Sequence, residues 1–223
     1  MRVVSTVLIK AGSAALTTWS DVQLELGLKD ADRAWTEKAI TRVSAIIAQY
    51  CNRVFGLQVI QDEFIPENQP FGWQYPDTKE DLRLSAWPVQ GAASVALPDR
   101  TLLDGVDYRL DPKSGELFRI DEVGQIIPWI PLTVTAVYEA GYILPNDSGY
   151  VAGDASALPA DIQDAAISLV RARYFARKRD PLLKSEDVPD VGAAQYWIGS
   201  VGDKQMPSDI ASTLDNYRPG VIA

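Results

Sequence analysis

The sequence contains no histidine and only one cysteine in 223 residues. The commonest general base and the commonest metal ligand are therefore missing, and neither a Ser-His-Asp nor a Cys-His catalytic site can be built. A single cysteine excludes an intramolecular disulfide. Cys51 follows apolar residues at helical spacing, which predicts a plain core thiol.

Motifs that bind nucleotides or activate a nucleophile are also missing. The sequence has no G-x-x-x-x-G-K-[ST] phosphate loop, no G-x-G-x-x-G turn and no G-x-S-x-G elbow. The segment "DGVDYRLDPKSGE" (residues 104–116) is rich in carboxylates but lacks the alternating spacing of a calcium loop, so it predicts a hairpin. We therefore expect no cofactor, no bound metal and no catalytic residue.

Positive charge is scarce as well. Lys and Arg number 21 against 30 Asp and Glu, and the resulting net charge of -9 repels nucleic acid and anionic membranes. Long apolar runs are missing, because no stretch approaches the roughly 20 residues of a membrane span. The opening "MRVVSTVLIKAGSAAL" has features of a signal peptide, but Lys10 cuts its apolar run short and the run is strand-like.

Two helices are predicted near the N-terminus. Thr18 and Asp21 have the spacing of a capping box, and Gly27 is placed to end a short first helix. Asp30 is a candidate N-cap for a longer second helix, which Gly56 would end. The apolar residues of this second helix recur at three- and four-residue steps: Trp35, Ala39, Val43, Ile46, Ile47, Tyr50 and Val54.

From residue 57 to about residue 142 the pattern changes to short strands separated by Pro and Gly. The segment "DPKSGE" predicts a turn in which Gly115 takes a positive φ. The loop "ENQPFGWQYPDTKE" carries Phe71, Trp73 and Tyr75, which form either a small core within the loop or an exposed contact patch. The candidate strands are "LQVIQDEFI", "DLRLSA", "ASVAL", "DYRLD", "ELFRI" and "LTVTAVYE".

Helix returns in "LPADIQDAAISLVRARYFARKRD" (residues 158–180), and "PSDIASTLDNY" (residues 207–217) predicts a last short helix. Amphipathic helices on both sides of the β segment need each other to bury their apolar faces. The predicted fold class is α+β, a helical bundle with a β-strand-rich insertion between the second and third helices. The predicted domains are residues 1–56 (N-terminal helical part), 57–142 (β-rich insertion) and 143–223 (C-terminal helical part and docking tail).

The third helix begins acidic and ends basic. Such an end has three interpretations: a solvated end that complements the helix dipole, a DNA-binding patch, or a docking surface for an acidic protein neighbour. Arg173 falls beside Leu169 in the apolar stripe, where an arginine usually needs a carboxylate partner. This position favours an ion pair inside the fold or across a subunit contact. The basic cluster consists of Arg171, Arg173, Arg177, Lys178 and Arg179.

The order and spacing of these segments resemble the head–tail connector (adaptor) proteins of long-tailed bacteriophages and gene-transfer agents. The resemblance covers most of the chain, and the third helix includes a similar Tyr-x-x-Arg ending at Tyr174 and Arg177. The other segments that carry it are "LTTWSDVQLELGL", "DADRAWTEKAITRVSAIIAQYCNRVFG", "LSAWPVQGAASVAL", "DGVDYRLDPKSGELFRI", "LTVTAVYEAGY" and "LDNYRP".

The resemblance implies a structural protein of the virion neck, with no catalysis. Copies would form a ring, expected to be a dodecamer, beneath the portal protein of a filled capsid. The ring would extend the DNA channel and dock the downstream neck or tail protein (stopper), while DNA passes through without sequence-specific binding. The protein would lie in the host cytoplasm during assembly, without contact with a membrane.

Such a ring suggests a role for the basic cluster. A closed ring needs heterologous contacts, so the basic helix end of one acidic subunit would meet an acidic patch of the next, and the remaining negative charge would line the channel. We also expect residues 206–223 to dock on a neighbouring protein rather than to close their own bundle, with Leu214, Tyr217 and Arg218 as the contact residues.

Three alternatives stay open from the sequence. The first is another neck component, such as a stopper or tail-completion protein. The second is an enzyme that uses only carboxylates, which would need two facing acids in a deep pocket. The third is a bacterial structural or interaction protein with the same architecture.

Overall fold

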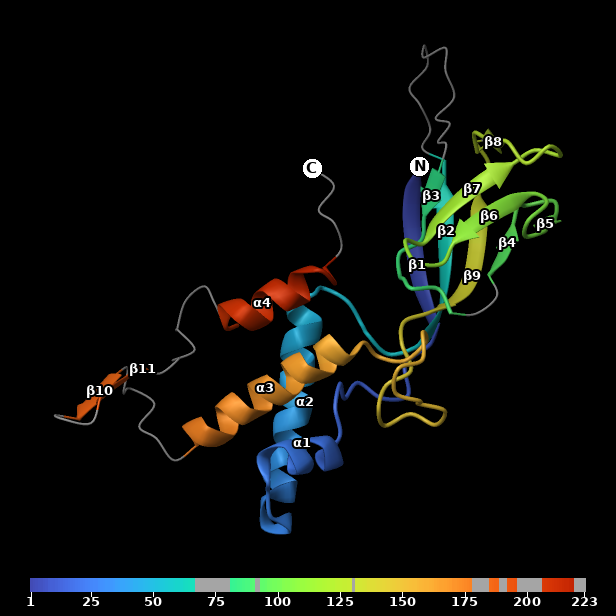
Figure 1. The fold of residues 1–223 in the computed structure, drawn as a ribbon. Helices are drawn as coiled ribbons and strands as arrows, with labels where there is room; N and C mark the ends of the chain where they lie inside the picture. Colours follow the sequence, from blue (N-terminus) through green and yellow to red (C-terminus); the bar gives the residue numbers. More distant parts are fainter. Residues whose placement is uncertain are drawn as a thin grey trace. The chain divides into compact units, whose positions relative to one another are not determined.

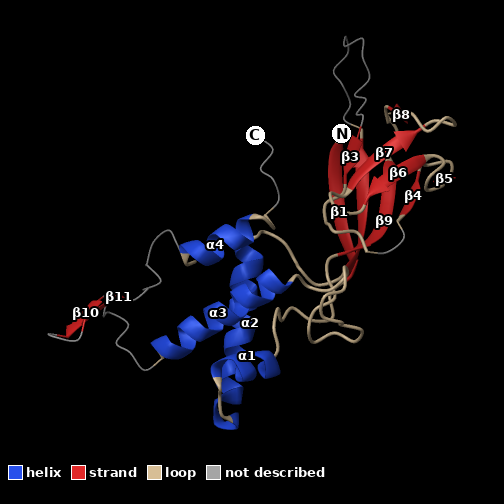
Figure 2. Cartoon of the chain, in the orientation of Figure 1, coloured by secondary structure: helices blue, strands red, loops and turns tan. Residues whose placement is uncertain are grey.

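The computed structural model contains both helices and antiparallel β-sheets, and it divides into two compact units (Figures 1 and 2). The β-rich unit comprises Met1–Gly12 and Gly56–Ile143, and the helical unit comprises Ser13–Phe55 and Leu144–Ala223. None of the described helices has the length and apolar character to cross a membrane. The structure describes residues 1–66, 81–90, 93–129, 131–177, 185–188, 192–195 and 206–218.

The first helix begins and ends as its sequence predicts. The Thr18 side chain accepts a hydrogen bond from the backbone N–H of Asp21, whose carboxylate accepts one from the N–H of Thr18, so the capping box is confirmed. Gly27 ends the helix with a φ of 61°, a left-handed conformation that favours glycine. The helices of this unit are α1 (Trp19–Leu26), α2 (Arg33–Tyr50), α3 (Ala160–Ala176) and α4 (Ser208–Asp215).

The predicted bounds of the second helix are wrong at both ends. Asp30 does not cap it but begins a 3-10 turn, η1 (Asp30–Asp32), and α2 starts at Arg33. The helix ends at Tyr50 rather than near Gly56, because Asn52 turns the chain with a φ of 48°. Val54 consequently lies outside the buried stripe and is exposed.

Every strand segment predicted from the sequence contains a strand. The predicted turn between β6 (Tyr108–Asp111) and β7 (Glu116–Ile120) is confirmed. Gly115 has a φ of 73°, and the Asp111 carboxylate accepts hydrogen bonds from the Ser114 hydroxyl and the Lys113 N–H. These hydrogen bonds, the Ser114 bond foremost, lower the pKa of Asp111. The strands that correspond to the predicted segments are β2 (Gln58–Ile65), β3 (Asp81–Arg83), β4 (Ser94–Ala96), β6 (Tyr108–Asp111), β7 (Glu116–Ile120) and β9 (Val134–Ala140).

The β-rich unit also contains the strands β1 (Arg2–Ile9), β5 (Thr101–Leu102) and β8 (Ile126–Ile127). Its larger sheet has the strand order β1-β2-β9-β4-β5, and a second sheet has the order β3-β7-β6 with β8 paired to β7. Strands β10 (Ser185–Val188) and β11 (Gly192–Gln195) form a separate two-stranded sheet.

The N-terminal segment departs from the predicted domain division. Strand β1 pairs antiparallel with β2, from Arg2 opposite Ile65 to Ile9 opposite Val59, so it belongs to the β-rich unit rather than to a helical part that starts at residue 1. The β-branched residues of β1 explain its strand conformation. The helical unit therefore begins at Ser13.

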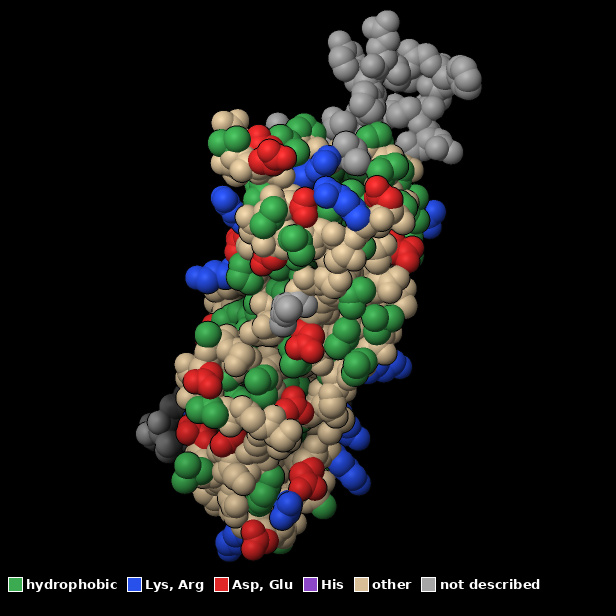
Figure 3. Space-filling view, turned by 90° about the vertical axis from the view of Figure 1, so that its right-hand side faces the viewer, with side chains coloured by type: hydrophobic (Ala, Val, Ile, Leu, Met, Phe, Trp, Pro, Cys, Tyr) green, Lys and Arg blue, Asp and Glu red, His purple; other side chains and the backbone are tan. Residues whose placement is uncertain are grey.

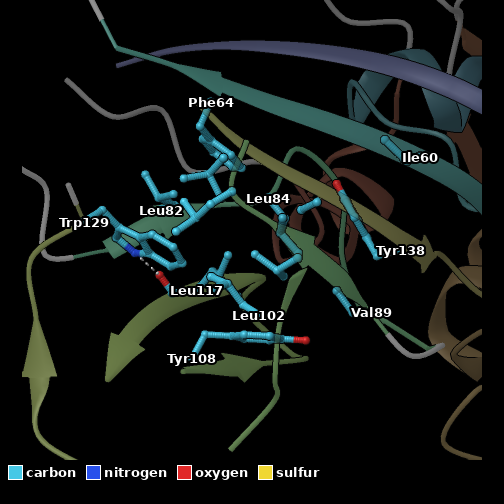
Figure 4. Close-up of a cluster of buried hydrophobic side chains, with 14 of the residues drawn as sticks. Ile60, Phe64, Leu82, Leu84, Val89, Leu102, Tyr108, Leu117, Trp129 and Tyr138 are labelled. Atoms are coloured by element: carbon cyan, nitrogen blue, oxygen red, sulfur yellow. Dashed lines mark hydrogen bonds between the residues drawn. The ribbon is translucent and has the colours of Figure 1, made fainter. Parts of the chain in front are cut away.

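Large side chains from both sheets form the core of the β-rich unit (Figure 4). Trp129 is fully buried, and its indole N–H donates a hydrogen bond of 3.1 Å to the carbonyl of Leu117. The hydrogen bond satisfies the one polar atom that this side chain brings into the core. Burial of each such side chain contributes about 1.5–3 kcal/mol. Other core residues are Ile60, Phe64, Leu82, Leu84, Val89, Val95, Leu102, Val134 and Tyr138.

Candidate interaction surfaces

The basic end of α3 is joined to the start of α2. The Arg177 guanidinium lies 3.2 Å from the Asp32 carboxylate and stacks over the rings of Trp35 and Tyr174, at 5.2 and 5.3 Å from their centroids. The Tyr174 hydroxyl donates to the same carboxylate at 3.1 Å, and this hydrogen bond raises the pKa of Tyr174. We call Asp32, Trp35, Tyr174 and Arg177 the α2–α3 clasp. In this clasp, the ion pair and ring contacts of Arg177 are made within its own subunit.

Two other residues of the basic cluster face solvent. Arg171 and Arg173 are exposed, and Phe175 beside them is 63% exposed. The prediction that Arg173 lies in the apolar stripe is wrong, because Val170 completes the buried face and the last turn of α3 is accessible. Lys178 and Arg179 lie outside the described residues. Of the described residues in the predicted cluster, all three arginines are exposed, but only Arg177 forms an ion pair within its own subunit.

The C-terminal helix packs on its own unit. Leu214 is 0% exposed, and Met206 and Ile210 are also buried. Contacts link α4 with α3, and the Cys51 thiol donates to the Leu214 carbonyl at 3.7 Å. The expectation that these residues dock on a neighbour instead of closing their own bundle is wrong for Leu214, because an eight-residue helix gains its stability by burying its apolar face.

Hydrogen bonds from tyrosine hydroxyls also attach the C-terminal segment to its own unit. Tyr217 donates to both oxygens of the Asp161 carboxylate at 2.8 Å, and its ring packs edge-on against Phe55. Tyr50 donates to Asp215 at 2.8 Å, which raises the pKa of Tyr50. These bonds join residues more than 50 positions apart in the sequence, so no local spacing could reveal them.

Arg218, the remaining predicted contact residue of the tail, also has partners in its own unit. Its guanidinium lies 3.3 Å from the Asp215 carboxylate and stacks over the ring of Tyr50, 5.3 Å from the centroid. Its side chain is about half exposed, so this ion pair contributes little to stability. The predicted loop contact patch of Phe71, Trp73 and Tyr75 lies outside the described residues.

Cys51 is buried, as predicted, and burial raises the pKa of its thiol from 9.0 to about 11. A raised pKa in the folded state stabilises the fold below the unfolded pKa, and this contribution is lost as the pH rises through about 11. We expect the stability advantage of the wild type over Cys51→Ala to shrink by about 2 kcal/mol between pH 9 and 11.

Urea unfolding of both proteins at pH 8, 9, 10 and 11 measures this difference. Tyrosines titrate in both proteins, so their contribution cancels in the comparison. Parallel stability curves for the two proteins would show that the thiol carries no pH dependence.

Among the described residues, the buried carboxylate of Asp62 is engaged by hydrogen bonds within the β-rich unit. Asp62 is fully buried and accepts three hydrogen bonds, from the Ser85 N–H at 2.7 Å, the Ser85 hydroxyl at 2.8 Å and the Tyr138 hydroxyl at 2.7 Å. Burial raises the pKa of Tyr138 well above its usual range, so its hydroxyl remains a donor. Within the described ranges, no group of three or more His, Cys, Asp or Glu residues is placed to hold a metal ion.

No protein-family model and no curated protein matches the chain. Among solved structures, it is similar to a chain of the "Virion of native gene transfer agent (GTA) particle", with 17% identity, a TM-score of 0.50, and coverage of 96% of this chain and 94% of that chain. It is also similar to chains of the "Neck of empty GTA particle computed with C6 symmetry" (17% identity, TM-score 0.49, coverage 96% and 95%) and the "Neck of native GTA particle computed with C12 symmetry" (16%, 0.45, coverage 96% and 94%). The first likeness shows a shared fold over nearly the whole length of both chains.

Proposed function

We propose that this chain is a structural component of the neck that joins the capsid to the tail of a phage-like particle. More specifically, we propose an adaptor that forms a ring beneath the portal, extends the DNA channel and docks the next neck or tail protein. The observation that carries the proposal is the shared fold with a chain of a gene transfer agent virion, across 96% of this chain and 94% of that one. The order of the sequence segments supports the same class.

The arrangement of the units fits this class. We infer a helical bundle that receives a β-rich insertion between α2 and α3, with strand β1 added to the insertion from the N-terminal side. The helices before and after the insertion contact each other, as the α2–α3 clasp illustrates.

The charge distribution suits a passage for DNA. The net charge is -9, and on the face in Figure 3 acidic, basic and hydrophobic side chains are interspersed without a large basic patch. Walls of this kind let phosphates slide, whereas a continuous basic surface would bind them. Arg171 and Arg173 are exposed and few enough to serve a protein contact, where they would meet an acidic neighbour.

A stopper or tail-completion protein is the nearest competing role, and the binding partner separates the two. An adaptor binds the portal, whereas a stopper binds the adaptor or the tail tube. A carboxylate-only enzyme is disfavoured, because three of the roughly four acceptor sites of the buried Asp62 carboxylate are already occupied by Ser85 and Tyr138.

Electron microscopy of the protein mixed with the portal protein of the same particle tests the proposal. We expect rings on the portal with the wild type and none with the double variant Arg171→Glu and Arg173→Glu, because like charges would face each other at every contact around a ring. The melting temperature of this variant should change little, since an exposed charge usually matters by less than about 0.5 kcal/mol.

Arg177→Glu is the matched control for these variants. It places a carboxylate beside Asp32 and removes the cation over Trp35, so it should lower the free energy of unfolding by about 1 kcal/mol. If the wild-type protein binds the tail tube but never the portal, its role is that of a stopper rather than an adaptor. Normal rings formed by the Arg171→Glu and Arg173→Glu double variant would show that those arginines face solvent and make no contact between subunits.

A further inference from the structure

Strand β1 presents an apolar edge that no described strand covers. It stands at the end of the five-stranded sheet, so one side of its backbone has no strand partner among the described strands. All of its residues are exposed, with Ile9 at 62%. A long apolar edge strand is a ready template for another chain, and natural proteins usually cover it. The large exposed side chains are Val3, Val4, Val7, Leu8 and Ile9.

The register shows that part of this surface continues the core. Val3 lies opposite Phe64 and Val7 opposite Ile60, and residues that face each other across an antiparallel pair lie on the same side of the sheet. Phe64 and Ile60 are buried in the core, whereas both valines are exposed. The core face of the sheet thus extends beyond the layer that covers it.

The opposite edge of the same sheet carries a second apolar surface. Strand β5 ends the sheet on that side (Figure 1). Leu103, directly after this strand, is 62% exposed, and Val106 is 58% exposed. Exposed carboxylates of Asp99 and Asp104 flank these residues. We call residues 2–10 the β1 edge and residues 99–106 the β5 edge.

The two edges complement each other in charge. Arg2 and Lys10 bracket the apolar residues of the β1 edge, whereas the β5 edge carries Asp99 before its apolar residues and Asp104 between Leu103 and Val106. The one cation within the β5 edge, Arg100, already lies 3.2 Å from Asp107. Each edge therefore combines exposed hydrophobic side chains with charges of one prevailing sign.

We propose that the β1 edge of one copy docks on the β5 edge of a second copy of this chain. The occupant is a second copy because the complementary surface lies on the same sheet, at its other end. Two different surfaces that meet give a head-to-tail contact, which repeats from copy to copy and closes a ring when the rotation allows it. The closure of the ring rests on the proposed neck function, but the contact itself does not.

Cysteine crosslinking tests which surfaces meet. One protein carries Ser5→Cys in the middle of β1, and a second, size-tagged protein carries Val106→Cys; both sites are exposed, and the native Cys51 is buried. The matched control replaces Val106→Cys by Val151→Cys, an equally exposed apolar residue of the helical unit. The proteins are mixed at high concentration and oxidised, and unreduced gels resolve the products.

We expect several-fold more mixed disulfide dimer from Ser5→Cys with Val106→Cys than from Ser5→Cys with Val151→Cys. Equal yields, or no mixed dimer, would overturn the proposal. A predominance of Ser5→Cys homodimers would also overturn it, by showing that β1 pairs with itself. Rings seen on the portal without the mixed crosslink would leave the neck function standing and reject this contact alone.

Discussion

Replacement of Leu214 by Ala is expected to lower the free energy of unfolding of the helical unit by about 2–5 kcal/mol. Leu214 is 0% exposed and lies in the short helix α4, which is held to the rest of the unit by this burial and by the hydroxyls of Tyr50 and Tyr217. A cavity at this position removes the main apolar anchor of a helix too short to persist alone. Urea unfolding followed by circular dichroism measures the loss.

Leu24→Ala is the control for this substitution. Leu24 also lies in an eight-residue helix, α1, but it is 89% exposed, so the same chemical change should cost less than about 0.5 kcal/mol. Hydrogen exchange should accelerate in α4 and in its neighbour α3 for the Leu214 variant only. Equal stability of the two variants would mean that α4 does not pack on its own subunit in solution.

Asp62→Ala should destabilise the β-rich unit by about 2–5 kcal/mol. The substitution removes the carboxylate that accepts hydrogen bonds from the buried Tyr138 hydroxyl and from the backbone N–H of Ser85, an exposed residue. A hydrogen bond to a charged group contributes about 1.5–3 kcal/mol, and a buried donor left without a partner costs about 1–3 kcal/mol. Because β2, β9 and the segment after β3 each contribute one of these groups, the variant should loosen all three.

Tyr138→Phe separates the two parts of this effect. It keeps the ring in the core and removes one donor to Asp62, so its cost should be smaller than that of Asp62→Ala. Thermal unfolding monitored together with hydrogen exchange of β2 and β9 provides the measurement. An Asp62→Ala protein as stable as the wild type would imply that water replaces the carboxylate and that this region is wet.

Local signals predicted the local structure well. The capping box of Thr18 and Asp21, the left-handed Gly27 and the turn at Gly115 each depend on residues within a few positions, and the structure confirms all three. Alternating apolar residues likewise located the strands of the β-rich unit. The second helix was placed too long because Asn52, rather than a glycine, supplies the left-handed turn that ends it.

The partners of the site residues could not be predicted in the same way. Arg177 meets Asp32 across 145 positions, and Tyr217 meets Asp161 across 56, so only the packing of helices decides these pairs. A tyrosine that donates to an aspartate has no spacing rule in sequence. The basic cluster looked uniform for this reason, although the structure pairs Arg177 with Asp32 of its own subunit and leaves Arg171 and Arg173 at the surface without such an ion pair to a described residue.

The assignment of β1 to the β-rich unit has a consequence for synthesis on the ribosome. The strand emerges before its pairing partner β2, which starts at Gln58, after helices α1 and α2 have been made. The helical unit in turn lacks α3 and α4 until the whole β-rich unit has emerged. Each unit consists of two segments that are separated in the sequence by part of the other unit. Neither unit can therefore complete its fold until its second segment has been synthesised. The nascent chain therefore carries the apolar residues of β1 unpaired for about 50 residues of elongation, a few seconds at 5–20 residues per second, during which a chaperone or the ribosome surface is their available cover.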